Sequence, residues 1–222
     1  FGTIIVDKSV ALKENVDTAI IKIEDLSKIK FRLTAKENII DMADGSIIYN
    51  QGQEIGTYNL DKNGDLKIEN LPMGIYELQE IETIDGAVLN ETKYEIKFEQ
   101  KDNATKEYTE TREIENETTL VEISKKAVTG DDELEGAKLT LFDKDGNIVD
   151  SWISGKQTHT IEGLKVGEEF TLREDLSPFG FVKASDITFT IENTSKVQKI
   201  TMIDKVVTMS KVDIAGEELE GA

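Results

Sequence analysis

Apolar and polar residues alternate along most of the 222-residue chain, in short runs separated by Gly, Asp, Asn or Ser. Alternation at period two, with many β-branched and aromatic residues, predicts strands that bury one face. Turn residues recur about every eight to twelve positions, which is typical of an all-β sandwich or barrel. We expect strands at TIIVDKSV, FRLTA, GSIIYN, DLKIEN, IYELQE, YEIKFE and TREIEN, and then at LVEISKK, KLTLFD, NIVDSWIS, EEFTLRED, DITFTIE and QKITMID.

The strand pattern repeats along the chain. The pentapeptide ELEGA occurs at Glu133–Ala137 and again at Glu218–Ala222, after the related phrases VEISKKAVTGDD and VTMSKVDIAGE. A restated phrase at this scale indicates tandem units. We therefore predict one domain at 1–118, a second at 119–206, and the first strand and turn of a truncated third repeat at 207–222.

The first unit carries an extra stretch that the second lacks. Residues 11–28 read ALKENVDTAIIKIEDLSK and lie between its first two expected strands. The pattern is compatible with a short helix or with another hairpin, and it does not decide between them.

Composition excludes several classes of function. A formal charge of −19 argues against nucleic acid, because a phosphate backbone requires Lys and Arg. The chain has no cysteine and a single histidine, His159, so we expect no disulfide, no metal site and no cofactor. No apolar run is long enough to span a membrane. DKNGD (61–65) and DKDGN (143–147) lack the glutamate that closes a calcium loop and are predicted to be hairpin turns.

Polar residues continue rows that should face the core. In the second unit the rows are Val121, Ile123 and Lys125; Phe170, Leu172 and Glu174; and Ile200, Met202 and Asp204. In the first unit they are Ile4, Val6 and Lys8; Tyr76, Leu78 and Glu80; and Ile114 and Asn116. A strand-end side chain that extends to water, or a buried ion pair, would explain any one of them. Neither explains why the same order recurs in two units of different length.

A buried lysine, glutamate and asparagine or aspartate can form an amide. Burial lowers the pKa of an amine and raises that of a carboxylic acid, so the amine can be a neutral nucleophile. A protonated glutamate can then polarise the carbonyl and move protons to the leaving group. The fold supplies proximity, and the product is one isopeptide bond per domain.

These residues resemble the isopeptide-forming Cna B-type (SpaA-like) domains of Gram-positive surface adhesins and pilins. The second unit carries the resemblance in ISKKAVTGDDELEGAKLTLFDKDGNIVDSWIS and FTLREDLSPFGF, and the first in GIYELQE after LPM. The resemblance implies an all-β fold of tandem immunoglobulin-like, prealbumin-like sandwiches. The extra stretch of the first unit departs from the family pattern.

The resemblance also implies a role for each residue. Lys8 and Asn116 would be linked in the first unit with Glu80 as the catalytic acid, and Lys125 and Asp204 in the second with Glu174. Lys126 should point outward by parity. Lys211 would be the nucleophile of a third repeat whose partners lie outside this sequence, so we expect it to be unlinked.

Two functions follow from this reading. The first is a structural stalk on the surface of a Gram-positive cell, held by self-made crosslinks and anchored to the wall by a signal outside this segment. The second is recognition of a host protein or glycan, such as an extracellular-matrix component, through the extra stretch of the first unit. Neighbouring repeats are the expected partners in the first case. An enzyme with turnover is not expected, since the site consumes itself.

Overall fold

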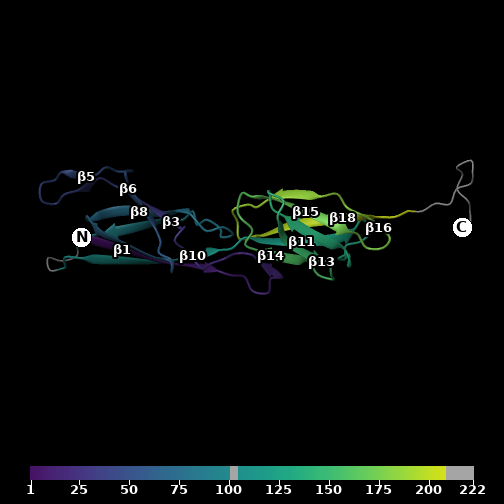
Figure 1. The fold of residues 1–222 in the computed structure, drawn as a ribbon. Helices are drawn as coiled ribbons and strands as arrows, with labels where there is room; N and C mark the ends of the chain where they lie inside the picture. The colour runs from purple at the N-terminus through teal and green to yellow at the C-terminus, as the bar shows by residue number, and fades with distance from the viewer. Residues whose placement is uncertain (101–104, 209–222) are drawn as a thin grey trace, which may run out of the picture. The chain divides into compact units, whose positions relative to one another are not determined.

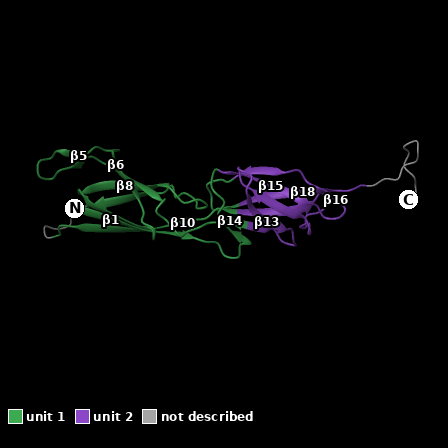
Figure 2. Ribbon diagram, viewed as in Figure 1, with its two compact units in different colours: residues 1–120, 161–167, 191–197 green, residues 121–160, 168–190, 198–222 purple. Residues whose placement is uncertain are grey.

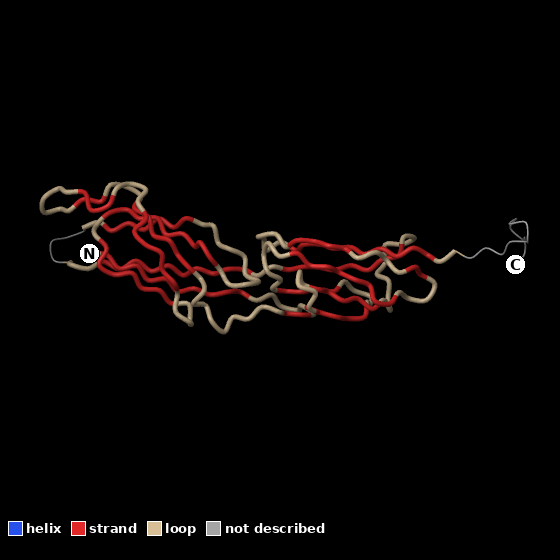
Figure 3. Tube along the Cα trace, turned by 45° about the horizontal axis from the view of Figure 1, so that its top comes forward, coloured by secondary structure: helices blue, strands red, loops and turns tan. Residues whose placement is uncertain are grey.

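The computed structural model describes residues 1–100 and 105–208, and its regular structure consists entirely of strands (Figure 3). The predicted all-β class is confirmed. The chain folds as two compact units, which Figure 2 distinguishes by colour. Unit 1 comprises Phe1–Leu120, Ile161–Gly167 and Ile191–Val197, and unit 2 comprises Val121–Thr160, Glu168–Thr190 and the chain from Gln198 onward.

Unit 1 is built on two facing sheets, and Figure 1 labels β1 and β10 of one and β3, β6 and β8 of the other. One sheet has the order β10-β1-β7 and the other β6-β3-β8-β9, and β4 and β5 form a separate two-stranded ribbon. Strand β1 runs parallel to β10 and antiparallel to β7. The strands are β1 (Gly2–Ala11), β2 (Thr18–Ala19), β3 (Lys30–Ala35), β4 (Ile39–Ile40), β5 (Ile47–Tyr49), β6 (Glu54–Asn59), β7 (Asp65–Leu71), β8 (Gly74–Glu82), β9 (Lys93–Phe98) and β10 (Tyr108–Glu117).

Unit 2 repeats the two-sheet plan. One sheet has the order β13-β12-β15-β17, and the strands of the other follow one another as β16, β18, β11 and β14. The strands are β11 (Leu120–Ala127), β12 (Lys138–Phe142), β13 (Ile148–Ile153), β14 (His159–Glu162), β15 (Glu169–Leu176), β16 (Phe181–Val182), β17 (Ile187–Thr190) and β18 (Val197–Val206).

Alternation along the strands builds the core of each unit. In β8, residues 76, 78 and 80 are buried while 77 and 79 are half-exposed, and β15 repeats this pattern at 170, 172 and 174. The apolar members fill the space between the sheets, where Phe31, Leu33, Tyr76 and Leu78 of unit 1 are fully buried. Burial of such side chains is the main favourable term in folding. The inward rows of the sequence therefore lie where the alternation placed them.

The extra stretch of unit 1 is neither a helix nor a hairpin. Apart from Ala11 at the end of β1, its only strand is the two-residue β2. Thr18 of β2 pairs in parallel with Ile161, which lies in the part of β14 that belongs to unit 1. Leu26 and the adjoining Ile29 pack into the hydrophobic core. Part of this segment therefore has a structural role.

The two predicted hairpin turns have different outcomes. Residues 143–147 connect β12 to β13, which pair antiparallel, so the hairpin prediction is confirmed there. Residues 61–65 connect β6 to β7, which belong to different sheets, so that prediction is wrong. In both turns an aspartate, Asp61 or Asp143, accepts hydrogen bonds from backbone amides two and four residues later. The sequence predicted the local turn chemistry, but it did not predict which strands pair on either side of each turn.

The lone histidine is half-buried. His159 lies on β14 with its ring stacked on Trp152, the centroids 4.1 Å apart, and with Nε2 2.7 Å from a carboxylate oxygen of Asp150. Trp152 is half-buried on β13, which agrees with its assignment as a strand residue.

Candidate crosslinking sites

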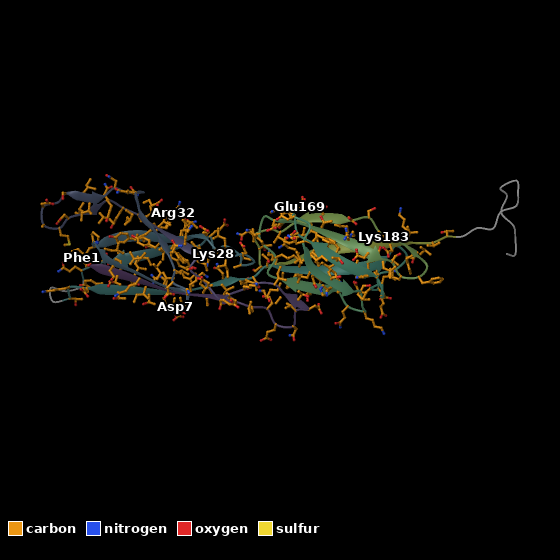
Figure 4. The ribbon with its side chains drawn as sticks, viewed as in Figure 1. Phe1, Asp7, Lys28, Arg32, Glu169 and Lys183 are labelled. Carbon is orange, nitrogen blue, oxygen red and sulfur yellow. The ribbon has the colours of Figure 1, made fainter. Side chains whose placement is uncertain are left out.

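In unit 1 the predicted lysine, glutamate and asparagine are all buried between the sheets. Lys8, Glu80 and Asn116 are only 2%, 1% and 2% exposed. Lys8 lies on β1 and Asn116 on the parallel neighbour β10, where Asn116 pairs with Val10. Glu80 lies on β8 of the facing sheet, so three strands from two sheets contribute to one site. Asp7, next to Lys8, is exposed, as parity requires (Figure 4).

Hydrogen bonds hold the glutamate and the asparagine of unit 1 together. Asn116 Nδ2 donates to Glu80 Oε1 over 2.6 Å and to Thr83 Oγ1 over 3.0 Å. Lys8 Nζ lies 3.7 Å from Glu80 Oε2 and donates to the backbone oxygen of Ser9 over 3.0 Å. Glu80 Oε2 and Asn116 Oδ1 are buried without a hydrogen-bond partner. Unpaired buried polar atoms are costly, and they mark this cluster as a candidate reactive site.

Burial shifts the proton affinities in unit 1 towards the neutral forms. Desolvation lowers the pKa of Lys8 to about 8, although the charges of Glu80 and Glu115 act in the opposite direction. Desolvation also raises the pKa of Glu80, against the opposing effects of Lys8 and of the hydrogen bond from Asn116. A neutral amine beside a protonated acid is the combination that amide formation needs.

In unit 2 the corresponding residues are in closer contact. Lys125, Glu174 and Asp204 lie on β11, β15 and β18, and each is 1% exposed or less. Lys125 Nζ contacts Asp204 Oδ1 directly and lies 3.1 Å from Glu174 Oε1. Strands β11 and β18 are neighbours in one sheet, and β15 belongs to the other. The arrangement therefore matches that of unit 1 strand for strand.

A bulge follows the glutamate in each unit. In unit 1, Phe31 of β3 pairs with Glu80 and Lys30 with Glu82, so Ile81 is the extra residue. In unit 2, Leu139 of β12 pairs with Glu174 and Lys138 with Leu176, so Asp175 is extra. A bulge disrupts the alternation and redirects the side chains next to it. Each glutamate is thus the last residue of its inward row.

A glycine brings the chain close to the lysine of unit 1. Gly64 has φ +100°, and a Cβ atom there would lie 2.2 Å from the backbone oxygen of Lys8. The Lys8 amide donates to the Gly64 oxygen over 2.9 Å. Only glycine accommodates both the positive φ and the close approach.

The sequence did not single out several residues that support the sites. In unit 2, Glu133 of ELEGA accepts from Ser124 Oγ over 2.5 Å and from the Lys125 amide over 2.8 Å. The amide of Ala184 donates to Glu174 Oε2 over 2.7 Å. Thr83 of unit 1 lies in the turn after β8. The repetition of ELEGA was a signal for Glu133, whereas nothing in the strand pattern pointed to Thr83 or Ala184.

The other predictions concern two lysines, a metal site and a membrane span. Lys126 is half-exposed, whereas Lys125 is buried, as parity predicted. Lys211 lies outside the described residues. Within residues 1–100 and 105–208, no group of three or more His, Cys, Asp or Glu is arranged to hold a metal ion. The same residues contain no helix long and apolar enough to cross a membrane.

Two stacked sheets in each unit, with a buried cross-sheet cluster, define a prealbumin-like β-sandwich. Residues 16–113 and 119–206 each match the family described as SpaA: Prealbumin-like fold domain. The chain belongs to this family. No curated protein sequence matches the chain.

Similar solved structures include a Bacillus anthracis protein and two pilus proteins of Lactobacillus rhamnosus GG. The Bacillus anthracis TIE protein is 23% identical with a TM-score of 0.48, covering 96% of this chain and 36% of that one. A C-terminal fragment of the pilus adhesin SpaC from Lactobacillus rhamnosus GG is 15% identical with a TM-score of 0.47, covering 93% and 98%. The shaft pilin SpaA of the same organism is 13% identical with a TM-score of 0.36, covering 93% and 98%. This chain thus spans about a third of the TIE protein's length.

Proposed function

We propose that this chain is part of the stalk of a Gram-positive surface adhesin or pilin, in which each domain joins its first and last strands by an isopeptide bond. The bonds are Lys8–Asn116 in unit 1 and Lys125–Asp204 in unit 2. The observation that carries the proposal is the recurrence of one buried cluster, on equivalent strands, in both units. Family membership adds the expectation of a cell-surface location.

The chemistry follows from the groups present. In unit 1 the neutral amine of Lys8 attacks the side-chain carbonyl of Asn116, and the protonated Glu80 polarises that carbonyl. In unit 2 the amine of Lys125 attacks the side-chain carbonyl of Asp204, next to Glu174. Ammonia leaves from Asn116, and water leaves from Asp204. The packed sheets hold the reacting groups together and exclude water, so no activating cofactor is required.

The crosslinks suit a load-bearing role because of the strands that they join. Lys8 and Asn116 lie on the first and last strands of the domain proposed at 1–118, and Lys125 and Asp204 on those of the domain proposed at 119–206. Tension that enters a domain through these strands would pass through the covalent bond and bypass the strands between them.

Peptide mapping of the purified chain tests the proposal. We expect two branched peptides, one joining Lys8 to Asn116 and the other Lys125 to Asp204. Glu80→Ala and Glu174→Ala should each remove only the branched peptide of their own unit and leave that unit folded. Linear peptides alone from the unmodified chain would refute the crosslinks, and a Glu174→Ala chain that still forms its bond would refute the role of the acid.

A further inference from the structure

The side-chain amide of Asn116 has both of its oxygen neighbours at the same end. Glu80 Oε1 and Thr83 Oγ1 lie 2.6 Å and 3.0 Å from the atom assigned as Nδ2. The other end of the amide, Oδ1, is buried without a partner. Two groups that can both donate a proton therefore converge on one terminal atom of the proposed electrophile.

In the productive orientation of this amide, Oδ1 and Nδ2 exchange places. A half-turn about the Cβ–Cγ bond exchanges Oδ1 and Nδ2 with almost no change in shape. A separation of 2.6 Å lies within the usual range of an O–H···O bond and just below the usual range of an N–H···O bond, which is about 2.7–3.2 Å. After the half-turn, the carbonyl oxygen faces the carboxyl group of Glu80 and the hydroxyl of Thr83. The raised pKa of Glu80 agrees with a protonated, donating acid.

We propose that the Thr83 hydroxyl is a second catalytic donor, which binds the Asn116 carbonyl oxygen together with Glu80 while the Lys8–Asn116 bond forms. The inference rests on the proposed crosslinking function. Charge develops on this oxygen as the amine attacks, and donors already aimed at such an oxygen stabilise the transition state.

The reaction balances without another reactant. The lone pair of Lys8 Nζ forms a bond to Asn116 Cγ, and electron density moves onto Oδ1, which Glu80 and Thr83 stabilise. When the carbonyl re-forms, the bond from Cγ to Nδ2 breaks. One amine proton passes through Glu80 to Nδ2, which leaves as ammonia, and Glu80 ends protonated as it began.

Unit 2 provides a built-in contrast. Ser177 occupies the same offset from Glu174 as Thr83 does from Glu80, but its hydroxyl donates to the backbone oxygen of Phe181 over 3.2 Å. Glu174 instead receives the amide of Ala184. The second donor is therefore a feature of the asparagine site, and unit 2 can serve as an internal reference.

Crosslinking kinetics in the full chain test this role. The chain is isolated unfolded from inclusion bodies in guanidinium, with its full sequence mass verified, and is then refolded by dilution. The masses of samples quenched over time report the loss of ammonia at Lys8–Asn116 and the loss of water at Lys125–Asp204. We expect Thr83→Val to slow the ammonia loss by about tenfold or more while the water loss keeps its rate, and Thr83→Ser to restore it.

The outcomes separate the two proposals. An unmodified chain that loses no ammonia refutes the crosslinking function itself. If the unmodified chain reacts and Thr83→Val reacts equally fast, Thr83 is not a donor. If Thr83 only hydrogen-bonds to Glu80, the variant should shift the pH profile of the rate without lowering its maximum, which also overturns the proposal. Thr83→Ala adds no atoms to the turn and replaces valine if circular dichroism shows that the valine variant does not fold.

Discussion

The two clusters share a scaffold but hold their proposed electrophiles, Asn116 and Asp204, differently. In unit 2 the lysine contacts the aspartate directly and lies 3.1 Å from the glutamate. In unit 1 the lysine lies 3.7 Å from the glutamate, and it is the glutamate that is hydrogen-bonded to the asparagine. Glu80 and Thr83 hold the asparagine of unit 1 through hydrogen bonds, whereas in unit 2 the lysine itself contacts the aspartate.

Removing the nucleophiles should have the largest effect on stability. The proposed bonds close loops of about 110 and about 80 residues, which by the disulfide analogy corresponds to roughly 4–5 kcal/mol each. We expect Lys8→Met and Lys125→Met each to lower the Tm of their own unit by more than about 15 °C in calorimetry. Methionine avoids leaving the buried space empty. Lys126→Met is the matched control, and an equal loss in the control would show that the crosslink is not the cause.

A change of pH should have the next largest effect on stability, and it should act on a first unit that lacks its crosslink. With Asn116→Ala, Lys8 stays free, and its pKa is about 8 when folded and 10.5 when unfolded. Between these values the unfolded chain binds more protons, so stability rises with pH, by on the order of 3 kcal/mol in total. Glu80 from β8 and Glu115 from β10 are the charged groups that influence Lys8.

Urea unfolding measures this rise when it is repeated at several pH values from about pH 7 to about pH 10.5, a range that includes the folded and the unfolded pKa of Lys8. The double variant Lys8→Met/Asn116→Ala reports all other titrating groups, and the difference between the two curves isolates Lys8. A flat difference curve would mean that Lys8 is not desolvated in the folded unit.

The Glu133 carboxylate should make a smaller contribution to the free energy of unfolding, and only in unit 2. Glu133→Gln weakens the hydrogen bonds from Ser124 and from the Lys125 amide, which hold the strand that carries the nucleophile. We expect a loss of about 1–2 kcal/mol in the urea unfolding of unit 2. Glu135→Gln, in the exposed part of the same pentapeptide, is the control. An equal loss of stability in both variants would show that the hydrogen bonds of Glu133 do not stabilise unit 2.

Exchanging the electrophiles should change the chemistry with the least effect on stability. Asp204→Asn should make unit 2 release ammonia in place of water. Asn116→Asp should make unit 1 release water. High-resolution mass spectrometry of each exchanged chain before and after crosslinking distinguishes the leaving groups. The linked products are identical, so the mass lost from the unlinked chain identifies ammonia or water. Failure of both exchanged chains to crosslink would show that each site is specific for its own electrophile.

The sequence predicted the inward clusters because they depend on parity alone. A strand alternates its faces, so a lysine two residues beyond an inward-facing valine also faces inward. Thr83 and Ala184 follow the strands that carry the two glutamates, beyond bulges that break parity, and their contacts depend on how each turn closes. The fold of residues 11–28 was not predictable either, because its packing relies on Leu26 and Ile29 meeting a distant core. Residues 61–65 showed turn chemistry, but only the pairing of β6 and β7 with other strands excludes a hairpin.

The most direct test of the central claim is the intact mass of the denatured chain. If each unit makes its own crosslink, the unmodified protein should weigh less than its sequence by one ammonia and one water. Glu80→Ala should restore the ammonia, Glu174→Ala the water, and the double variant the full sequence mass. A full sequence mass for the unmodified, folded chain would contradict the account.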